Sequence, residues 1–258
     1  MDYIIEAKKI IEDKNLSKFI KILLDHWESE PTSLGHGFSH VLKVAVNAYN
    51  FGKSNNYEKP EDIFVGGLFH DVYRPAEDKA GEEDQTKGAD VIKELFQKEN
   101  IDSNLIDKVT GAILSHDSWV GTENPPLYDL ILSTADKASH DNMIADSYIW
   151  ASLKFTNEKN IAPVFKNHLD TLVLFLKYEQ RAWSVFKKHP INGTEDAIEA
   201  YIKINENTFD AWRKDKVGEN FLNYIEEKAE LSRNEEIKYL KAFGRSEDSM
   251  KKIMGNCY

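Results

Sequence analysis

The chain has 258 residues, of which 41% are hydrophobic and 11% aromatic, so it can bury the core of one large domain or of a domain with a sizeable extension. Its 13 Gly and 7 Pro make up about 8% of the chain against a usual value of about 12%, which disfavours folds built from many short strands. With 33 basic and 44 acidic residues, the net charge of −11 repels nucleic acid and anionic membranes. An anionic substrate would need a local positive charge, which a bound metal can supply.

The cysteine count and the N-terminal sequence indicate where the protein works. Cys257 is the single cysteine, which excludes an internal disulfide and a cysteine zinc cluster. Residues 1–6 lack the basic and apolar regions of a signal peptide, and no run approaches the ~20 apolar residues of a membrane span. We therefore expect a cytoplasmic protein that binds neither a membrane nor a nucleic acid polymer, with assembly into a homodimer left open.

Apolar residues recur at i, i+3, i+4 and i+7 along most of the chain, which is the spacing of amphipathic helices. The first six predicted helices contain residues 20–27, 42–49, 60–69, 91–96, 105–113 and 127–135. Further helices are expected around residues 142–155, 161–187, 195–214, 218–230 and 234–243. Because convincing alternating strand patterns are absent, the sequence predicts an all-α fold.

Caps and a glycine pair in the sequence add detail to three of these predicted helices. Ser39 is a plausible N-cap of the second helix, and Asp102 with Ser103 is expected to cap the fifth. In the third helix the pair Gly66-Gly67 permits close contact with a neighbouring helix.

Four acidic or imidazole side chains lie at the ends or on the inward faces of these helices. His40 stands at the start of the second helix, and His70 with Asp71 ends the third. Asp136 lies four residues after Leu132, on the inward face of the sixth. A buried carboxylate is costly unless it is paired or binds a cation, and imidazole and carboxylate groups are the usual ligands of several divalent ions. The four side chains therefore fit a metal in a helical core, with open positions for water.

The order His, His-Asp, Asp resembles the HD superfamily of metal-dependent phosphohydrolases. The flanking residues agree with the resemblance, which rests on Ser39-His40, Gly67-Leu68-Phe69-His70-Asp71 and Ala135-Asp136-Lys137-Ala138-Ser139. It covers roughly residues 30–145. It implies a metal-binding HD-domain helical core within residues 1–156, and we expect additional C-terminal helices over residues 157–258 that pack on it.

The resemblance also implies an activity. The four side chains named above would bind one divalent ion, which lowers the pKa of a bound water and neutralises charge on a phosphoryl oxygen. The expected reaction is hydrolysis of a phosphate ester of a small metabolite, such as a nucleotide, by a phosphomonoesterase or phosphodiesterase. The ion could be Mn, Ni, Co, Mg, Fe or Zn, because this ligand set suits several metals.

The resemblance implies three further catalytic roles. Arg74 would hold a phosphate oxygen, and His116 would bind phosphate or protonate the leaving group. Arg74 stands where some nucleotidase members carry the Glu that serves as general base, so Glu77 or Asp78 would take that role.

Several alternatives stay open. A second metal could bind through Asp71, Asp84 and His116. His36 precedes His40 by four residues, but the flanking Gly35 and Gly37 favour a turn or pocket-lining role over a ligand role. Two other function classes are a di-iron HD-type oxygenase, which needs additional histidines, and a non-catalytic helical protein that binds a ligand.

Overall fold

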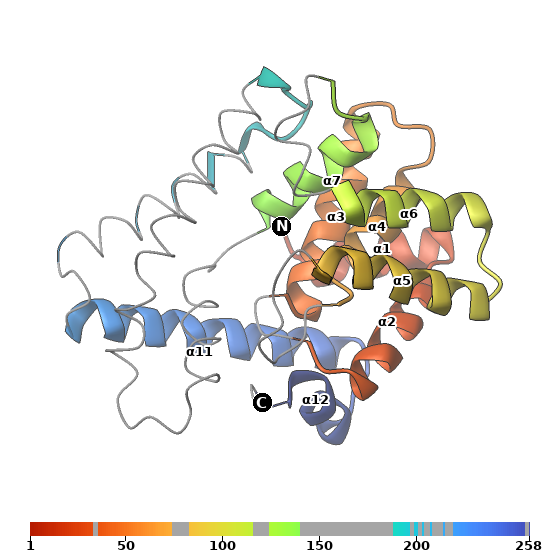
Figure 1. Cartoon of the computed structure of the whole chain (residues 1–258). Helices are drawn as coiled ribbons and strands as arrows, with labels where there is room; N and C mark the ends of the chain where they lie inside the picture. The colour runs from red at the N-terminus through yellow and green to blue at the C-terminus, as the bar shows by residue number, and fades with distance from the viewer. Residues whose placement is uncertain are drawn as a thin grey trace.

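A computed structural model of the chain describes residues 1–32, 36–73, 83–115, 124–139, 188–196 and 219–255, together with residues 199, 200, 203, 207, 214 and 258. This part of the chain contains nine α-helices and no strand, which confirms the predicted all-α class (Figure 1). Among these helices we find no segment that combines the length and the apolar character of a membrane span.

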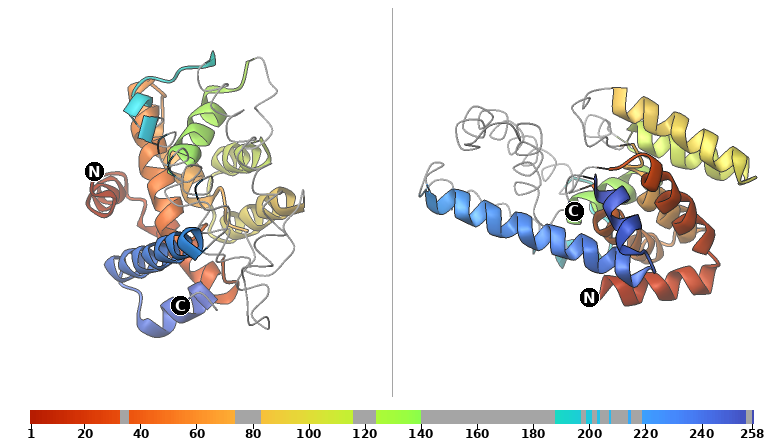
Figure 2. Two further views of the ribbon diagram at one scale, coloured as in Figure 1. Left: turned by 90° about the vertical axis from the view of Figure 1, so that its left-hand side faces the viewer. Right: turned by 90° about the horizontal axis from the view of Figure 1, so that it is seen from below.

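Seven helices form the N-terminal half of the described structure. They are α1 (Tyr3–Lys14), α2 (Ser17–Ser29), α3 (Phe38–Ser54), α4 (Pro60–Phe69), α5 (Glu83–Lys98), α6 (Ser103–Ser115) and α7 (Leu127–Ala138). Helix α3 packs against both α4 and α7, and α5 lies beside α6 (Figures 1 and 2). Towards the C-terminus, α11 (Glu219–Ala242) contacts α3 and α12 (Glu247–Met254) contacts α2.

The six helices predicted between residues 20 and 135 are all present, as α2 to α7. Helices α1 and α12 were not predicted, and the two helices expected at 218–230 and 234–243 are one continuous helix, α11. The helices expected at 142–155 and 161–187 lie outside the described residues, as do most residues of the one expected at 195–214 and the boundary at residue 156.

The predicted helix caps have different outcomes. Asp102 caps α6, because its Oδ1 accepts hydrogen bonds from the N–H groups of Asn104 (3.1 Å) and Leu105 (3.3 Å). The prediction for Ser39 is wrong, since this residue lies inside α3 and the N-cap position is occupied by Gly37. Glycine has no side chain to accept a hydrogen bond, so α3 begins without the local cap that the sequence indicated.

The hydrophobic core joins helices from both ends of the chain. One cluster of buried side chains includes residues of α1 to α6 together with Tyr239 and Leu240 of α11 and Met250 of α12. Within it, the indole Nε1 of Trp27 donates a hydrogen bond to the carbonyl of Val72 at 3.0 Å. This bond links α2 to the residues that immediately follow α4.

Helices α3 and α4 approach each other closely at Gly67. A Cβ atom added at Gly67 would lie 2.6 Å from the Cα atom and 2.8 Å from the backbone nitrogen of Ala45. Because backbone atoms cannot move aside as a side chain can, the predicted role of the Gly66-Gly67 pair in close helix contact is confirmed for Gly67.

We predict that Gly67→Ala lowers the free energy of unfolding by about 1–3 kcal/mol, because the added methyl group forces α3 and α4 apart. Gly111→Ala in α6 is the matched control. A Cβ atom at Gly111 meets nothing within 4 Å, so the alanine should raise stability by about 0.5–1 kcal/mol through its helix propensity alone. Urea denaturation measures both values. Equal stability of the two variants would contradict the close approach.

Candidate metal centre

The four ligands predicted from the sequence come from three helices that pack against one another. His40 lies in the first turn of α3, His70 and Asp71 follow the last residue of α4, and Asp136 lies in the last turn of α7. All four residues are buried, with exposed fractions of 6% for His40, 3% for His70 and Asp71, and 4% for Asp136. The packing of α3 against α4 and α7 therefore brings polar groups that are far apart in sequence into one buried cluster.

The side chains of these residues point at one another. The Oδ2 atom of Asp71 lies 2.9 Å from His70 Nε2 and 3.7 Å from His40 Nε2. The Oδ1 atom of Asp136 lies 3.2 Å from His40 Nε2 and 3.4 Å from His70 Nε2. Each of these two carboxylate oxygens thus lies within 3.7 Å of both imidazole nitrogens.

These separations fit the donor set of a metal ion. Donor atoms lie about 2.0–2.2 Å from a bound transition metal, so two donors are roughly 3.0 Å apart at a right angle and roughly 3.4 Å apart at a tetrahedral angle. The four distances of the cluster, 2.9–3.7 Å, bracket both values. The atoms contributed by His40, His70 and Asp136 all lie within 4.8 Å of one another.

Neighbouring groups orient two of the candidate ligands. The ring atom Nδ1 of His70 lies 2.8 Å from the carbonyl oxygen of Gly67, so Nδ1 carries the proton and Nε2 presents its lone pair to the cluster when the ring is neutral. The ammonium group of Lys137 lies 3.3 Å from Oδ2 of Asp136, the oxygen that does not face the histidines. Such contacts behind the donor atoms are typical of metal ligands.

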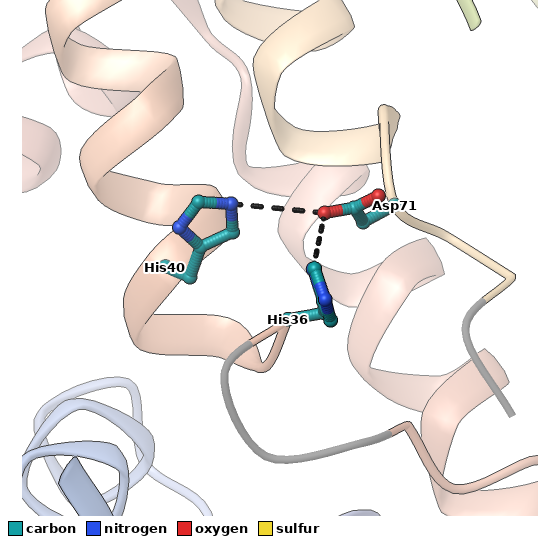
Figure 3. Close-up of side chains that lie close together, drawn as sticks. All are labelled: His36, His40 and Asp71. Carbon is teal, nitrogen blue, oxygen red and sulfur yellow. Dashed lines mark hydrogen bonds and ion pairs between the residues drawn. The ribbon is translucent and has the colours of Figure 1, made fainter. Parts of the chain in front are cut away.

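His36 is a fifth member of the cluster (Figure 3). It lies in the bend before α3, as its flanking glycines predicted, and its Nδ1 atom lies 2.8 Å from Oδ2 of Asp71. Donor atoms of His36, His40 and Asp71 also lie within 4.8 Å of one another. The spacing His-x-x-x-His was the signal that could have found this contact, although the sequence interpretation favoured a turn or pocket-lining role.

The two carboxylates dominate the electrostatics of the cluster. Burial alone would lower the pKa of His70, but the charges and hydrogen bonds of Asp71 and Asp136 outweigh burial and raise the pKa to about 10. In the metal-free protein His70 is therefore protonated at neutral pH. A cation that binds to its Nε2 atom must displace this proton.

Several residues with predicted roles lie outside the described residues. They are Arg74, Glu77, Asp78 and His116, and of Asp84 only the backbone is described, at the start of α5. Their catalytic roles, and the second metal through Asp71, Asp84 and His116, stay predictions.

The comparison with protein families agrees with the geometry. The family model described as the HD domain matches residues 37–141, a span that includes His40, His70, Asp71 and Asp136. Neither a curated protein nor a solved structure gives a significant match to the chain. HD domains bind divalent metals and are generally metal-dependent hydrolases. Residues 37–141 therefore match the HD-domain family, which confirms the resemblance to the HD superfamily of metal-dependent phosphohydrolases.

Proposed function

We propose that the protein is a metal-dependent phosphohydrolase that cleaves a phosphate ester of a small metabolite, such as a nucleotide. The proposal rests on one observation, the convergence of His40, His70, Asp71 and Asp136 in a buried cluster with the separations of metal ligands. The HD domain of the chain supports the choice of a hydrolytic reaction.

The charge of the cluster supports a divalent ion. The carboxylates of Asp71 and Asp136 carry two negative charges in a buried environment, and this arrangement is unfavourable unless positive charge compensates it. A divalent ion compensates both charges while the histidines bind it as neutral ligands. Metal binding would therefore replace the proton of His70 and stabilise the folded protein.

With an ion bound, the same cluster would activate both the attacking water and the phosphate ester. A bound divalent ion supplies a nucleophile at neutral pH by lowering the pKa of water, and it neutralises charge on phosphoryl oxygens. Such neutralisation matters for this chain, because its net charge of −11 opposes the approach of an anionic substrate.

His36 marks the side from which a substrate would approach. Its side chain is 34% exposed, whereas those of His40, His70, Asp71 and Asp136 are 1–6% exposed. Within this proposal Arg74 holds a phosphate oxygen, His116 binds phosphate or protonates the leaving group, and Glu77 acts as the general base.

Metal content and phosphate release test the proposed function. We predict about one divalent ion per chain by mass spectrometry of the native protein, and phosphate release from nucleotides in the presence of Mn, Ni, Co or Mg. Asp71→Ala and Asp136→Ala should each weaken metal binding by at least about a hundredfold and abolish phosphate release, because each removes a charged ligand.

The matched control is Asp90→Ala in α5. The Asp90 side chain is 72% exposed and lies 3.9 Å from Lys93, so its removal should change neither metal content nor activity. Two irons per chain would favour the oxygenase instead. Failure to bind any of these ions, even after reconstitution, would leave a helical binding protein.

Metal affinity should also depend on pH. Because the pKa of His70 is raised to about 10, each ion that binds at neutral pH displaces a proton. The apparent affinity should therefore rise about tenfold for each pH unit between pH 6 and 8 and fall on acidification. Titration calorimetry in buffers of different ionisation enthalpy measures the released proton.

The control for this titration is His26→Gln in α2. His26 lies outside the cluster and its pKa is lowered by burial, so the slope with pH should stay unchanged in the variant. An affinity of the wild-type protein that is constant from pH 6 to 8 would contradict the displacement of a proton from His70.

A further inference from the structure

The N-terminus of α3 receives its cap from the other end of the chain. The carboxylate of Glu236, in α11, accepts a hydrogen bond from the N–H of Phe38 at 2.8 Å through Oε1 and another from the N–H of Ser39 at 2.7 Å through Oε2. Glu236 is 2% exposed. Figure 1 shows the C-terminal end of α11, the long blue helix, reaching the group of helices that includes α3.

The N-terminus of α3 favours a carboxylate at the position of Glu236. The first N–H groups of a helix have no partner within the helix, and they lie at the positive end of the helix dipole, where a negative charge is stabilised. Burial raises the pKa of Glu236, and the N–H groups of Ser39 and Phe38 oppose that effect. Each carboxylate oxygen thus accepts a hydrogen bond from a backbone N–H, and the side chain of Ser39 adds a further hydrogen bond to the carboxylate. Accepting such N–H bonds is the role that a local N-cap side chain normally has.

Gly37 leaves the space that the carboxylate occupies. A Cβ atom at Gly37 would lie 2.8 Å from Cδ and 2.9 Å from both oxygens of Glu236. The φ and ψ angles of Gly37, −76° and −171°, are open to any residue, so the constraint at this position is the space that Glu236 fills.

The residues held by Glu236 lie between two histidines of the candidate metal centre. His36 and His40 flank the Gly37-Phe38-Ser39 segment. On one side His36 contacts Asp71 at 2.8 Å, and on the other side Glu236 fixes the backbone that separates the two histidines. A change in this backbone would move both imidazoles relative to Asp71 and Asp136.

We propose that Glu236 is a positioning residue of the metal centre, and that α11 completes the site by fixing the turn that carries His36 and His40. This inference rests on the proposed metal-binding function. It assigns to the C-terminal part of the chain a role in metal affinity, through the backbone of α3 and without direct contact with the ion.

The next residue of α11 provides a matched control. Glu235 Oε2 lies 2.7 Å from Nζ of Lys43, which is one turn further along α3. Glu235→Gln therefore weakens the attachment of α11 to α3 without touching the N–H groups of Phe38 and Ser39. A general loss of helix docking would affect Glu235→Gln and Glu236→Gln alike, whereas a positioning role distinguishes them.

The test measures metal affinity and the geometry of the histidines in the full-length protein, at a temperature where circular dichroism shows each variant folded. We expect Glu236→Ala to weaken Co²⁺ binding by about tenfold or more and to change the visible absorption spectrum of bound Co²⁺. Glu236→Gln keeps one acceptor oxygen and should show a smaller loss. Glu235→Gln should bind Co²⁺ within about twofold of the wild-type affinity and keep its spectrum.

A second variant removes the same contact without substituting Glu236. Gly37→Ala pushes the carboxylate away, so it should reproduce the affinity and the spectrum of Glu236→Ala. The double variant should be no weaker than either single one, because the contact can be lost only once. If Glu236→Ala does not fold, Gly37→Ala and Glu236→Gln provide the same comparison.

The possible failures are distinguishable. Wild-type affinity and spectrum in Glu236→Ala, or an equal loss in Glu235→Gln, would overturn the positioning role and leave the metal centre intact. Absence of metal binding by the wild-type protein would instead overturn the proposed function. In that case, imidazole nitrogen resonances of His36 and His40 that are the same in metal-free wild-type and Glu236→Gln protein would also overturn the positioning role.

Discussion

The close contact of α3 with α4 at Gly67 is the constraint on which the rest of the site depends. Without a side chain at this position, the backbone of α4 reaches that of Ala45, and the end of α4 is set beside the start of α3. The same glycine offers its carbonyl oxygen to Nδ1 of His70, so helix packing and ring orientation have a common origin. A bulkier residue would alter the distance between the helices and the direction of His70 together.

The buried polar groups show how the fold accommodates charge in its interior. The carboxylates of Asp71 and Asp136 face imidazoles, and the outer oxygen of Asp136 faces Lys137. The carboxylate of Glu236 is stabilised in another way, by backbone N–H groups at a helix end. In both places the cost of burying a carboxylate is offset by donors held at fixed distances, which limits how far the surrounding helices can move.

The sequence was sufficient for the parts of the fold that depend on local patterns. Apolar spacing predicted α2 to α7, and the order of His40, His70-Asp71 and Asp136 predicted which side chains meet. The contacts that were missed join distant positions. Glu236 is 198 residues from Phe38, and no local sequence pattern links the two positions. Helical periodicity indicates that a position is buried but does not identify the residue that it contacts. Because the distant Glu236 could not be identified as the cap of α3, the local sequence favoured Ser39 for this role.

The distance along the chain between Glu236 and α3 has a consequence for protein synthesis. The last of the four candidate metal ligands, Asp136, precedes Glu236 by about a hundred residues, so all four emerge from the ribosome well before α11 does. Contacts of such long range form late, because the chain must close a large loop before they contribute. The nascent chain therefore passes through a stage in which α2 to α7 can pack while the turn with His36 and His40 still lacks its cap. The final geometry of the site is acquired only after α11 has been made.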